Sequence, residues 1–217
     1  MRKLYVLLVV FSISLLTNKA GAQLLKRPDQ VLGLSFSTSD ISGIGSVVTG
    51  TSTVHSNYTA TLRQYGFVYG FRYNIIKLSI GSISLGSPLM AGFSSTDKYH
   101  SIDFDGTKRD TIAGITGLNF ACEIPVFADL NLGLYSAEDE SPKKRFGVYA
   151  GVGYMYSYTR VHTSLGRSNY DGFEPAVRAG IRMGKRWESR WSLNFYMRAG
   201  YSHSGMRTYG MQLLKEL

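Results

Sequence analysis

From residue 146 to residue 159 the chain reads FGVYAGVGYMYSYT. Every second residue of this stretch is aromatic or apolar: Phe146, Val148, Ala150, Val152, Tyr154, Tyr156 and Tyr158. All glycines of the stretch lie between these positions. A period of two predicts a β-strand, because successive side chains of a strand leave opposite faces. One face is bulky and apolar and the other is small, which is typical of a strand between lipid and a narrow lumen.

Seven other stretches favour strands, and 62–74 repeats the same pattern with five outward aromatic residues. Together with 145–160, the predicted strands are 31–38, 62–74, 76–87, 112–132, 174–184, 190–203 and 207–217. The weakest alternation is that of 76–87. Eight is an even number and the smallest in this class of barrel. The sequence therefore predicts an all-β fold, an eight-stranded antiparallel up-and-down transmembrane β-barrel.

The connections between these strands alternate in length. The long ones, rich in Ser, Thr, Gly, Asp and Asn, are 39–61, 88–111 and 161–173. The connections that are shorter on average are 74–76, 133–144 and 185–189. Outer-membrane barrels have long outer loops and short periplasmic turns, so this pattern predicts that both termini lie in the periplasm. The short connection around Ser204 to Met206 breaks the pattern on the outer side.

The N-terminus has the organisation of a secretory signal peptide. Met1 to Lys3 is positively charged, Leu4 to Leu16 is apolar, and Ala20-Gly21-Ala22 supplies a small-residue cleavage site. The apolar run is too short for a comfortable transmembrane helix. We therefore expect a signal peptide over 1–22 and a single barrel domain over 23–217, in the outer membrane of a Gram-negative bacterium.

Composition narrows the set of partners. Loss of Arg2, Lys3 and Lys19 with the signal lowers the net charge from +9 to +6. An exported basic chain meets little nucleic acid, so we expect outer-membrane lipid and lipopolysaccharide as partners, with a further protein partner at the outer loops. Cys122 is the only cysteine, which excludes an internal disulfide framework. We expect a monomer.

Two segments resemble the small β-barrel proteins of Bacteroidetes outer membranes, including the PorT-like group. Leu118 to Phe127, LNFACEIPVF, resembles that family's strand with glutamate, isoleucine and proline, and Val148 to Tyr154, VYAGVGY, resembles the strand that follows. The Ala22-Gln23 junction is also common there. The resemblance implies an eight-stranded barrel of the OmpA and OmpX type, and one PorT-like branch is associated with secretion and gliding machinery.

The C-terminus departs from the usual pattern of outer-membrane barrels. Many of them end on an aromatic residue, whereas this chain ends LKEL from Leu214 to Leu217. Either the last strand stops near Leu213 and a tail follows, or the eighth predicted strand is wrong.

Charged residues on the predicted inner faces form the most coherent candidate site. The members of this predicted lumen charge network are Arg72, Glu123, Asp129, Arg178, Arg182 and Arg198. Buried charges need partners, and an eight-stranded interior is just wide enough to be filled by side chains. We therefore predict a salt-bridged plug in which Glu123 pairs with at least one arginine, with a conducting pore or anion site as the alternative. Pro125 predicts a β-bulge within its strand.

A second candidate site has the residue types of a hydrolase. His162, Ser164 and Glu174 faintly resemble the residues of outer-membrane lipid A deacylases, although the flanking residues and the spacing differ. Polar loop residues explain the same pattern, because a triad is recognised by geometry. The acidic stretch from Asp103 to Asp110 lacks the third acid and later glutamate of a calcium loop, so no metal or cofactor is expected.

The sequence favours a non-enzymatic, structural or surface-interaction barrel with a largely plugged lumen. Two alternatives stay open: a lipid-modifying hydrolase built on His162, Ser164 and Glu174, and an accessory component of a secretion or gliding apparatus.

Overall fold

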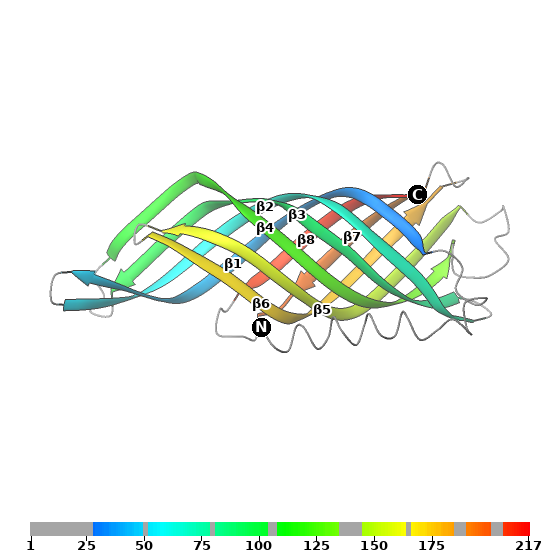
Figure 1. The fold of residues 1–217 in the computed structure, drawn as a ribbon, viewed down its shortest axis with the longest axis horizontal. Helices are drawn as coiled ribbons and strands as arrows, with labels where there is room; N and C mark the ends of the chain where they lie inside the picture. Colours follow the sequence, from blue (N-terminus) through cyan, green and yellow to red (C-terminus); the bar gives the residue numbers. More distant parts are fainter. Residues whose placement is uncertain are drawn as a thin grey trace.

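The computed structural model is an eight-stranded antiparallel β-barrel (Figure 1). It describes residues 28–49, 52–78, 81–103, 108–134, 145–163, 166–184, 190–200 and 206–217. The strands are β1 (Asp29–Thr49), β2 (Ser52–Lys77), β3 (Gly81–Asp103), β4 (Lys108–Gly133), β5 (Phe146–Thr163), β6 (Gly166–Met183), β7 (Trp191–Arg198) and β8 (Arg207–Glu216). The predicted signal peptide lies outside these residues. Among the described residues, no helix has the length and apolarity needed to span a bilayer.

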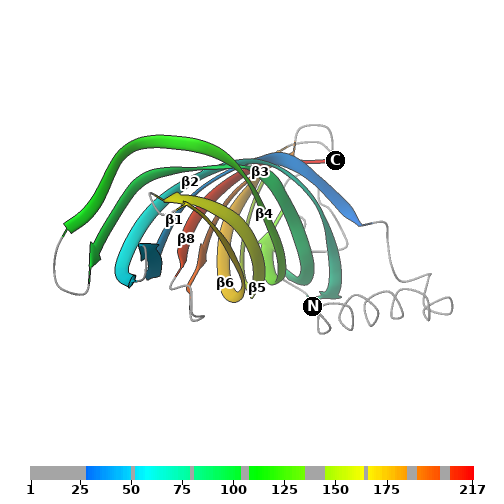
Figure 2. The same ribbon diagram turned by 60° about the vertical axis from the view of Figure 1, so that its left-hand side comes forward.

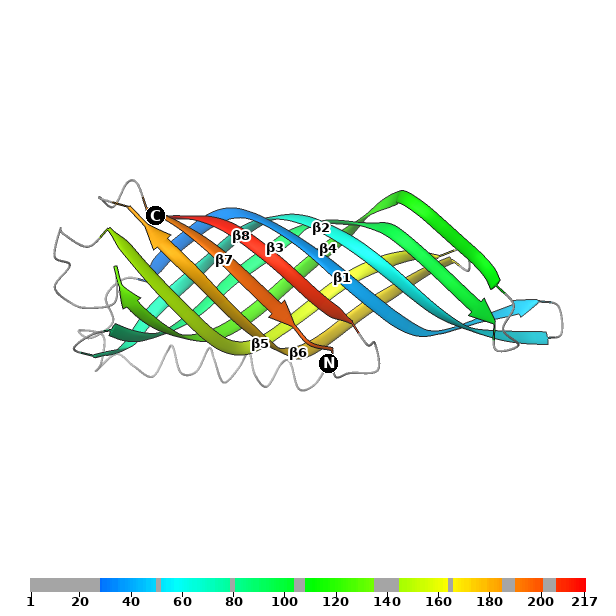
Figure 3. The ribbon, with the colours of Figure 1, turned by 180° about the vertical axis from the view of Figure 1, so that it is seen from behind.

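Each strand pairs with its neighbours in chain order, and β8 pairs with β1 to close the sheet. Closure rests on the register from Val31 opposite Glu216 to Asp40 opposite Arg207. Figure 3 shows β8 lying between β7 and β1. The fold class is therefore the one that the alternating sequence predicts.

The barrel is apolar outside and polar inside, the reverse of a water-soluble barrel. Large side chains point outward and stay exposed, among them Phe67 (71%), Val152 (65%) and Phe195 (54%). The side chains between them are buried, and many of these are serine, threonine, asparagine, glutamine or charged. An apolar exterior of this size is unfavourable in water, whereas it matches the hydrocarbon core of a bilayer.

Aromatic rings mark the height of the apolar exterior. Phe36 and Tyr65 lie side by side on β1 and β2, with ring centroids 5.2 Å apart, and Phe120 lies 6.4 Å from Tyr158 on β4 and β5. On β5 the outward row runs from Phe146 to Tyr158. At about 3.3 Å per residue and a tilt near 45°, this row spans about 28 Å of membrane thickness.

The hairpins on the side away from the termini are longer than the sequence predicts. The prediction of outer loops is wrong over most of 39–61, 88–111 and 161–173, because these ranges are largely paired strand. β1 continues to Thr49, β3 continues to Asp103, and β6 already begins at Gly166. These ends extend beyond the barrel wall formed by β7 and β8 (Figure 2). Alternation weakens there because the two faces of the sheet no longer separate lipid from lumen.

Two smaller predictions about strand ends are also wrong, and a third is confirmed. The third strand begins at Gly81, not near 76, since β2 continues to Lys77 and Leu78 N donates to the Gly81 carbonyl at 2.7 Å. β7 ends at Arg198, five residues earlier than expected. The eighth strand, predicted over 207–217, is confirmed as Arg207–Glu216, and the alternative in which it stops near Leu213 is wrong.

Pro125 causes no bulge. The register between β3 and β4 is the same on both sides of it, although the pairs between Gly86–Phe127 and Met90–Glu123 are missing. The Ser87 hydroxyl donates to the Pro125 carbonyl at 2.5 Å and bridges this gap. Pro125 keeps its register partner Met155 on β5.

The exposed position of Val152, midway between Phe146 and Tyr158, predicts a steep cost for charge. Val152→Arg should lower the free energy of unfolding by about 2–4 kcal/mol, because it places a cation at the bilayer midplane. Val152→Leu serves as the control and should be nearly neutral. Equilibrium urea unfolding in phospholipid vesicles measures both, and equal tolerance of the two would contradict the assigned lipid face.

Candidate functional site: the polar barrel interior

The interior of the barrel contains all six residues of the predicted lumen charge network. They lie at alternate positions whose neighbours face lipid, and each is at most 7% exposed: Arg72, Glu123, Asp129, Arg178, Arg182 and Arg198. The period of two therefore carries each of these charges into the lumen.

Glu216 is the centre of a cluster at the end of the barrel where β1 begins and β8 ends. Its Oε1 lies 3.1 Å from a terminal nitrogen of Arg72 and 3.1 Å from Nε of Arg182. Arg72 also donates to Asp29 Oδ2 at 2.6 Å. This cluster joins β1, β2, β6 and β8, so it ties together strands from both ends of the chain.

A second ion pair lies beside this cluster. Arg178 makes a bidentate contact with Asp129, with nitrogen–oxygen distances of 2.8 Å and 2.5 Å. The Arg178 guanidinium also lies 4.4 Å from the ring centre of Phe127, while Arg182 lies 4.1 Å from that of Tyr149. Aromatic faces thus cover the parts of the guanidinium groups that carboxylates do not contact.

Asn131 connects Arg182 to the polar side chains of β3 by hydrogen bonds. Arg182 donates to Oδ1 of Asn131 at 2.7 Å, and Nδ2 of Asn131 donates to the Ser84 hydroxyl at 2.9 Å. An amide can accept from a cation and donate to a hydroxyl at once, which suits it to this position.

The outer half of the lumen contains a separate polar group. The Tyr196 hydroxyl donates to Oε2 of Glu123 at 2.7 Å. Arg198 lies 3.6 Å from Glu174 and donates to the Thr208 hydroxyl at 2.9 Å. The sequence predicted an arginine as the partner of Glu123. In the structure Arg198 interacts with this carboxylate electrostatically, while its hydrogen bond comes from Tyr196, which β7 brings across the lumen.

Formal charges in the described interior balance. The arginines are Arg72, Arg178, Arg182, Arg190 and Arg198. The acidic residues are Asp29, Glu123, Asp129, Glu174 and Glu216. The predicted lumen charge network did not include four of these ten residues: Asp29, Glu174, Arg190 and Glu216. Continuing the alternation from Gln212 through Leu214 would have placed Glu216 inside, and the same step backward from Ala176 would have placed Glu174 there.

Apolar side chains fill the space between the polar groups. One buried cluster consists of Phe127, Met155, Ala176 and Tyr196. Another consists of Val31, Val68, Met90 and Leu214. A third, at the outer end, consists of Ile41, Ala60, Leu62 and Met206, with Tyr170 packed against it. These clusters lie among further buried polar contacts, such as the hydrogen bond from Ser37 to Gln64 and that from Asn194 to Gln212, both 2.9 Å.

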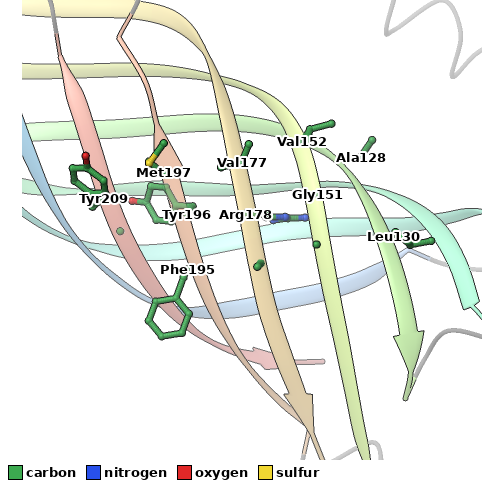
Figure 4. Close-up of a pocket in the computed structure, with 13 residues that line it drawn as sticks. Ala128, Leu130, Gly151, Val152, Val177, Arg178, Phe195, Tyr196, Met197 and Tyr209 are labelled. Carbon is green, nitrogen blue, oxygen red and sulfur yellow. The ribbon is translucent and has the colours of Figure 1, made fainter.

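A groove of about 870 Å³ lies against the barrel wall from β4 to β8 (Figure 4). Most of its lining is outward-facing and apolar, with the small side chains of Ala128, Ala150 and Ala179 between larger ones such as Leu130 and Phe195. Tyr209 is the titratable side chain on its exposed lining, since Tyr196 is buried and Arg178 is buried and paired with Asp129.

The geometry gives the hydrolase alternative no support. Glu174 lies opposite Met155, whereas His162 lies opposite Arg167, which separates the two positions by about 23 Å along β5 at 3.3 Å per residue. Glu174 is buried in the lumen beside Arg198. Ser164 and the His162 side chain lie outside what the structure describes. Within the described residues, no group of three or more His, Cys, Asp or Glu side chains is arranged to hold a metal ion.

Comparisons with known proteins give a likeness of fold. No protein-family model matches the chain, and no curated protein matches it in sequence. Among solved structures it is similar to Ail, the attachment invasion locus protein of Yersinia pestis, alone and in complex with the heparin analogue sucrose octasulfate. These matches cover 88% of this chain and 98% of Ail, at 8% and 9% identity, with TM-scores of 0.46 and 0.45. The outer membrane protein OprG from Pseudomonas aeruginosa matches over 88% of this chain and 94% of its own, at 12% identity and a TM-score of 0.41.

The central position of Glu216 predicts a large effect of removing its carboxylate. Glu216→Ala should lower the free energy of unfolding by about 3–5 kcal/mol, because it leaves two buried arginines without their shared partner. Lys215→Ala is the neighbouring control. A double-mutant cycle with Arg182→Met should return part of the loss; additive effects in urea unfolding would refute the contact.

The hydrogen bond of Tyr196 predicts a second effect on stability, smaller than that of Glu216→Ala. Tyr196→Phe should cost about 1–3 kcal/mol, because the hydroxyl is the hydrogen-bond donor to the buried Glu123 carboxylate. Tyr154→Phe is the matched control on the lipid face, where the ring stacks on Phe173 at 5.2 Å. Unfolding in vesicles compares the two, and a neutral Tyr196→Phe would show that the Glu123 contact does not matter.

Proposed function

We propose that this protein is a non-enzymatic integral outer-membrane barrel whose lumen is closed and whose outer surface makes its interactions. The observation that carries the proposal is the filled interior, in which five arginines and five acidic residues are interleaved with three apolar clusters. This packing supports a lumen without a water-filled path and without an open polar cavity for a substrate.

Lipid and lipopolysaccharide are the proposed partners at the membrane surface. Two exposed arginines each lie two residues from an outward-facing tyrosine, toward the tips of the hairpins. They are Arg63, near Tyr65 on β2, and Arg160, near Tyr158 on β5. Arg63 also pairs with Asp97 at 2.9 Å, yet its side chain remains 44% exposed. Guanidinium groups at this height are suited to the phosphates of lipid headgroups.

The remaining parts of the proposal come from the sequence. Export by the signal peptide over 1–22, a mature domain from residue 23, and membership of the PorT-like barrels of Bacteroidetes are inferred from the N-terminal pattern and the two resembling segments. The closed sheet supports a monomer, since every barrel strand is paired within one chain through the membrane-spanning part. No described feature favours the secretion-apparatus alternative.

Electrical recording tests the closed lumen. The full-length protein, purified and inserted into a planar lipid bilayer, should show no steady conductance, because packed side chains leave no continuous water. Faster migration of the unheated sample on a denaturing gel establishes that the barrel is folded. A stable open channel would favour the pore instead.

Cell fractionation tests the location. The protein should be recovered with outer membranes, because an apolar exterior of this height is unstable in water. Recovery as soluble periplasmic protein would overturn the proposal.

A further inference from the structure

The apolar outer face of the barrel is tall on β4 and β5. On β5 the outward row runs from Phe146 to Tyr158 without a charged residue, about 28 Å at 3.3 Å per residue and a tilt near 45°. On β4 the outward row runs from Leu118 to Leu132, about 33 Å by the same conversion. The apolar band of an outer-membrane barrel is about 25 Å tall, so these two strands cover the full hydrocarbon thickness.

The outward row on β8 is much shorter, and a cation borders it at each end. Its apolar side chains are Tyr209, Met211 and Leu213, and all three are exposed. Alternation continues this row to Arg207 on the outer side, which is exposed, and to Lys215 on the other side, which is half-buried. The two cations are eight residues apart, about 19 Å by the same conversion.

β1, which pairs with β8, has a short row as well. Its exposed apolar side chains at these heights are Leu32, Leu34 and Phe36. The exposed polar residues Gln30 and Asp40 border this row and are ten residues apart, about 23 Å. The register places Asp40 opposite Arg207, so the outer borders of the two rows coincide.

Aromatic side chains mark the same borders. Tyr209 is the outward residue next to Arg207, and Trp191 of β7 lies opposite Lys215. Both rings are exposed on the outside of the barrel. Tyrosine and tryptophan are enriched where hydrocarbon meets lipid headgroups. Their positions therefore place the two interfaces of the membrane at the ends of the short rows.

The tall rows and the short rows lie on opposite sides of the barrel. β4 and β5 are neighbours, β8 and β1 are neighbours, and the two pairs are four places apart in the closed ring of eight strands. Figure 3 shows the short side, with β8 between β7 and β1. The apolar band therefore has the form of a wedge that is tallest at β4 and β5 and lowest at β8 and β1.

We propose that this barrel thins the bilayer on its β8–β1 side, so that the lipids in contact with this face have compressed acyl chains. The inference deepens the proposed lipid interaction and rests on the proposed membrane location. Hydrocarbon of full thickness would cover Arg207, Asp40 and Lys215, and a charge in hydrocarbon is expensive. Compressing the adjacent chains costs little for each ångström of mismatch, so the membrane adapts to the short row.

Bending of the long side chains toward the headgroups does not remove this mismatch. Arginine and lysine can place their charges several ångströms from their Cα atoms. Asp40 has a short side chain, and the Thr61 hydroxyl donates to its Oδ1 at 2.9 Å. This carboxylate therefore fixes the outer border of the apolar band on the short side.

Spin-label depth tests the proposal on the full-length protein. In a Cys122→Ser background and in vesicles of dioleoyl phosphatidylcholine, single labels are attached to Met211→Cys and to Val152→Cys, at the midpoints of the short row of β8 and the tall row of β5. Power saturation with oxygen and a water-soluble nickel complex gives the depth of each label below the phosphates. The label at residue 211 should lie about 5 Å less deep than the label at residue 152, because its row is about 9 Å shorter.

Removal of the bordering charges identifies their role. Asp40→Leu, Arg207→Leu and Lys215→Leu together should deepen the label at residue 211 and leave the label at residue 152 unchanged. Arg160→Leu, beyond the end of the tall row on β5, is the control and should leave the label at residue 211 unchanged.

Equal depths at residues 211 and 152 would overturn the proposal, as would a label at residue 211 that does not respond to the three substitutions. If the triple variant fails to fold, which the gel mobility of the unheated sample reports, the comparison of residues 211 and 152 decides alone. Labels that are shallow at both residues would contradict the membrane location itself, so failure of the thinning is distinguishable from failure of the proposed function.

Discussion

Hydrocarbon cannot hydrogen-bond to a peptide group, and this constraint governs the whole structure. A chain that crosses the membrane with strands must close its sheet, because an open edge in lipid costs several kcal/mol for each unpaired group. β1 and β8 therefore pair over the membrane-spanning part. Closure with eight strands makes a lumen of side-chain width, and everything placed in that lumen must be packed and neutralised.

The charged interior follows from this narrowness. Glu216 illustrates it best, since a residue next to the C-terminus connects Arg72 of β2 and Arg182 of β6 while Leu217 N donates to Gln30 of β1. The end of the last strand is thus attached to the first strand by backbone and, through Arg72 and Asp29, by charge. Glu216 is thus a buried polar residue near the end of β8, where many barrels have an aromatic residue.

Much of the fold could be predicted from alternation alone. The rows around Val152, Tyr65 and Phe195 identified the strands and their lipid faces, because bilayer and lumen impose opposite chemistry on successive residues. The ends of the strands could not be predicted where they leave the membrane. The partner of Glu123 could not be predicted either, since contact across the lumen between β4 and β7 depends on tilt and register that a single strand does not encode. Glu216 was within reach of the same alternation, but the unusual C-terminal sequence suggested that the strand ended earlier.

The same constraint directs function to the outer surface. In our proposal the lumen is closed, so the rim and the outer hairpins are the places that meet water and other molecules. There, the strands need not close, and β7 and β8 do not follow the other six.

The central claim is that even-numbered residues of β5 face lipid and odd-numbered ones face a packed lumen. Spin labels on single cysteines from residue 146 to residue 158, in a Cys122→Ser background in vesicles, test it most directly by their collision rates with oxygen and with a water-soluble nickel complex. We predict high oxygen accessibility at even positions with its maximum at 152, and low accessibility to both reagents at odd positions. High nickel accessibility at odd positions would indicate a water-filled lumen, and oxygen maxima at odd positions would contradict the inverted barrel itself.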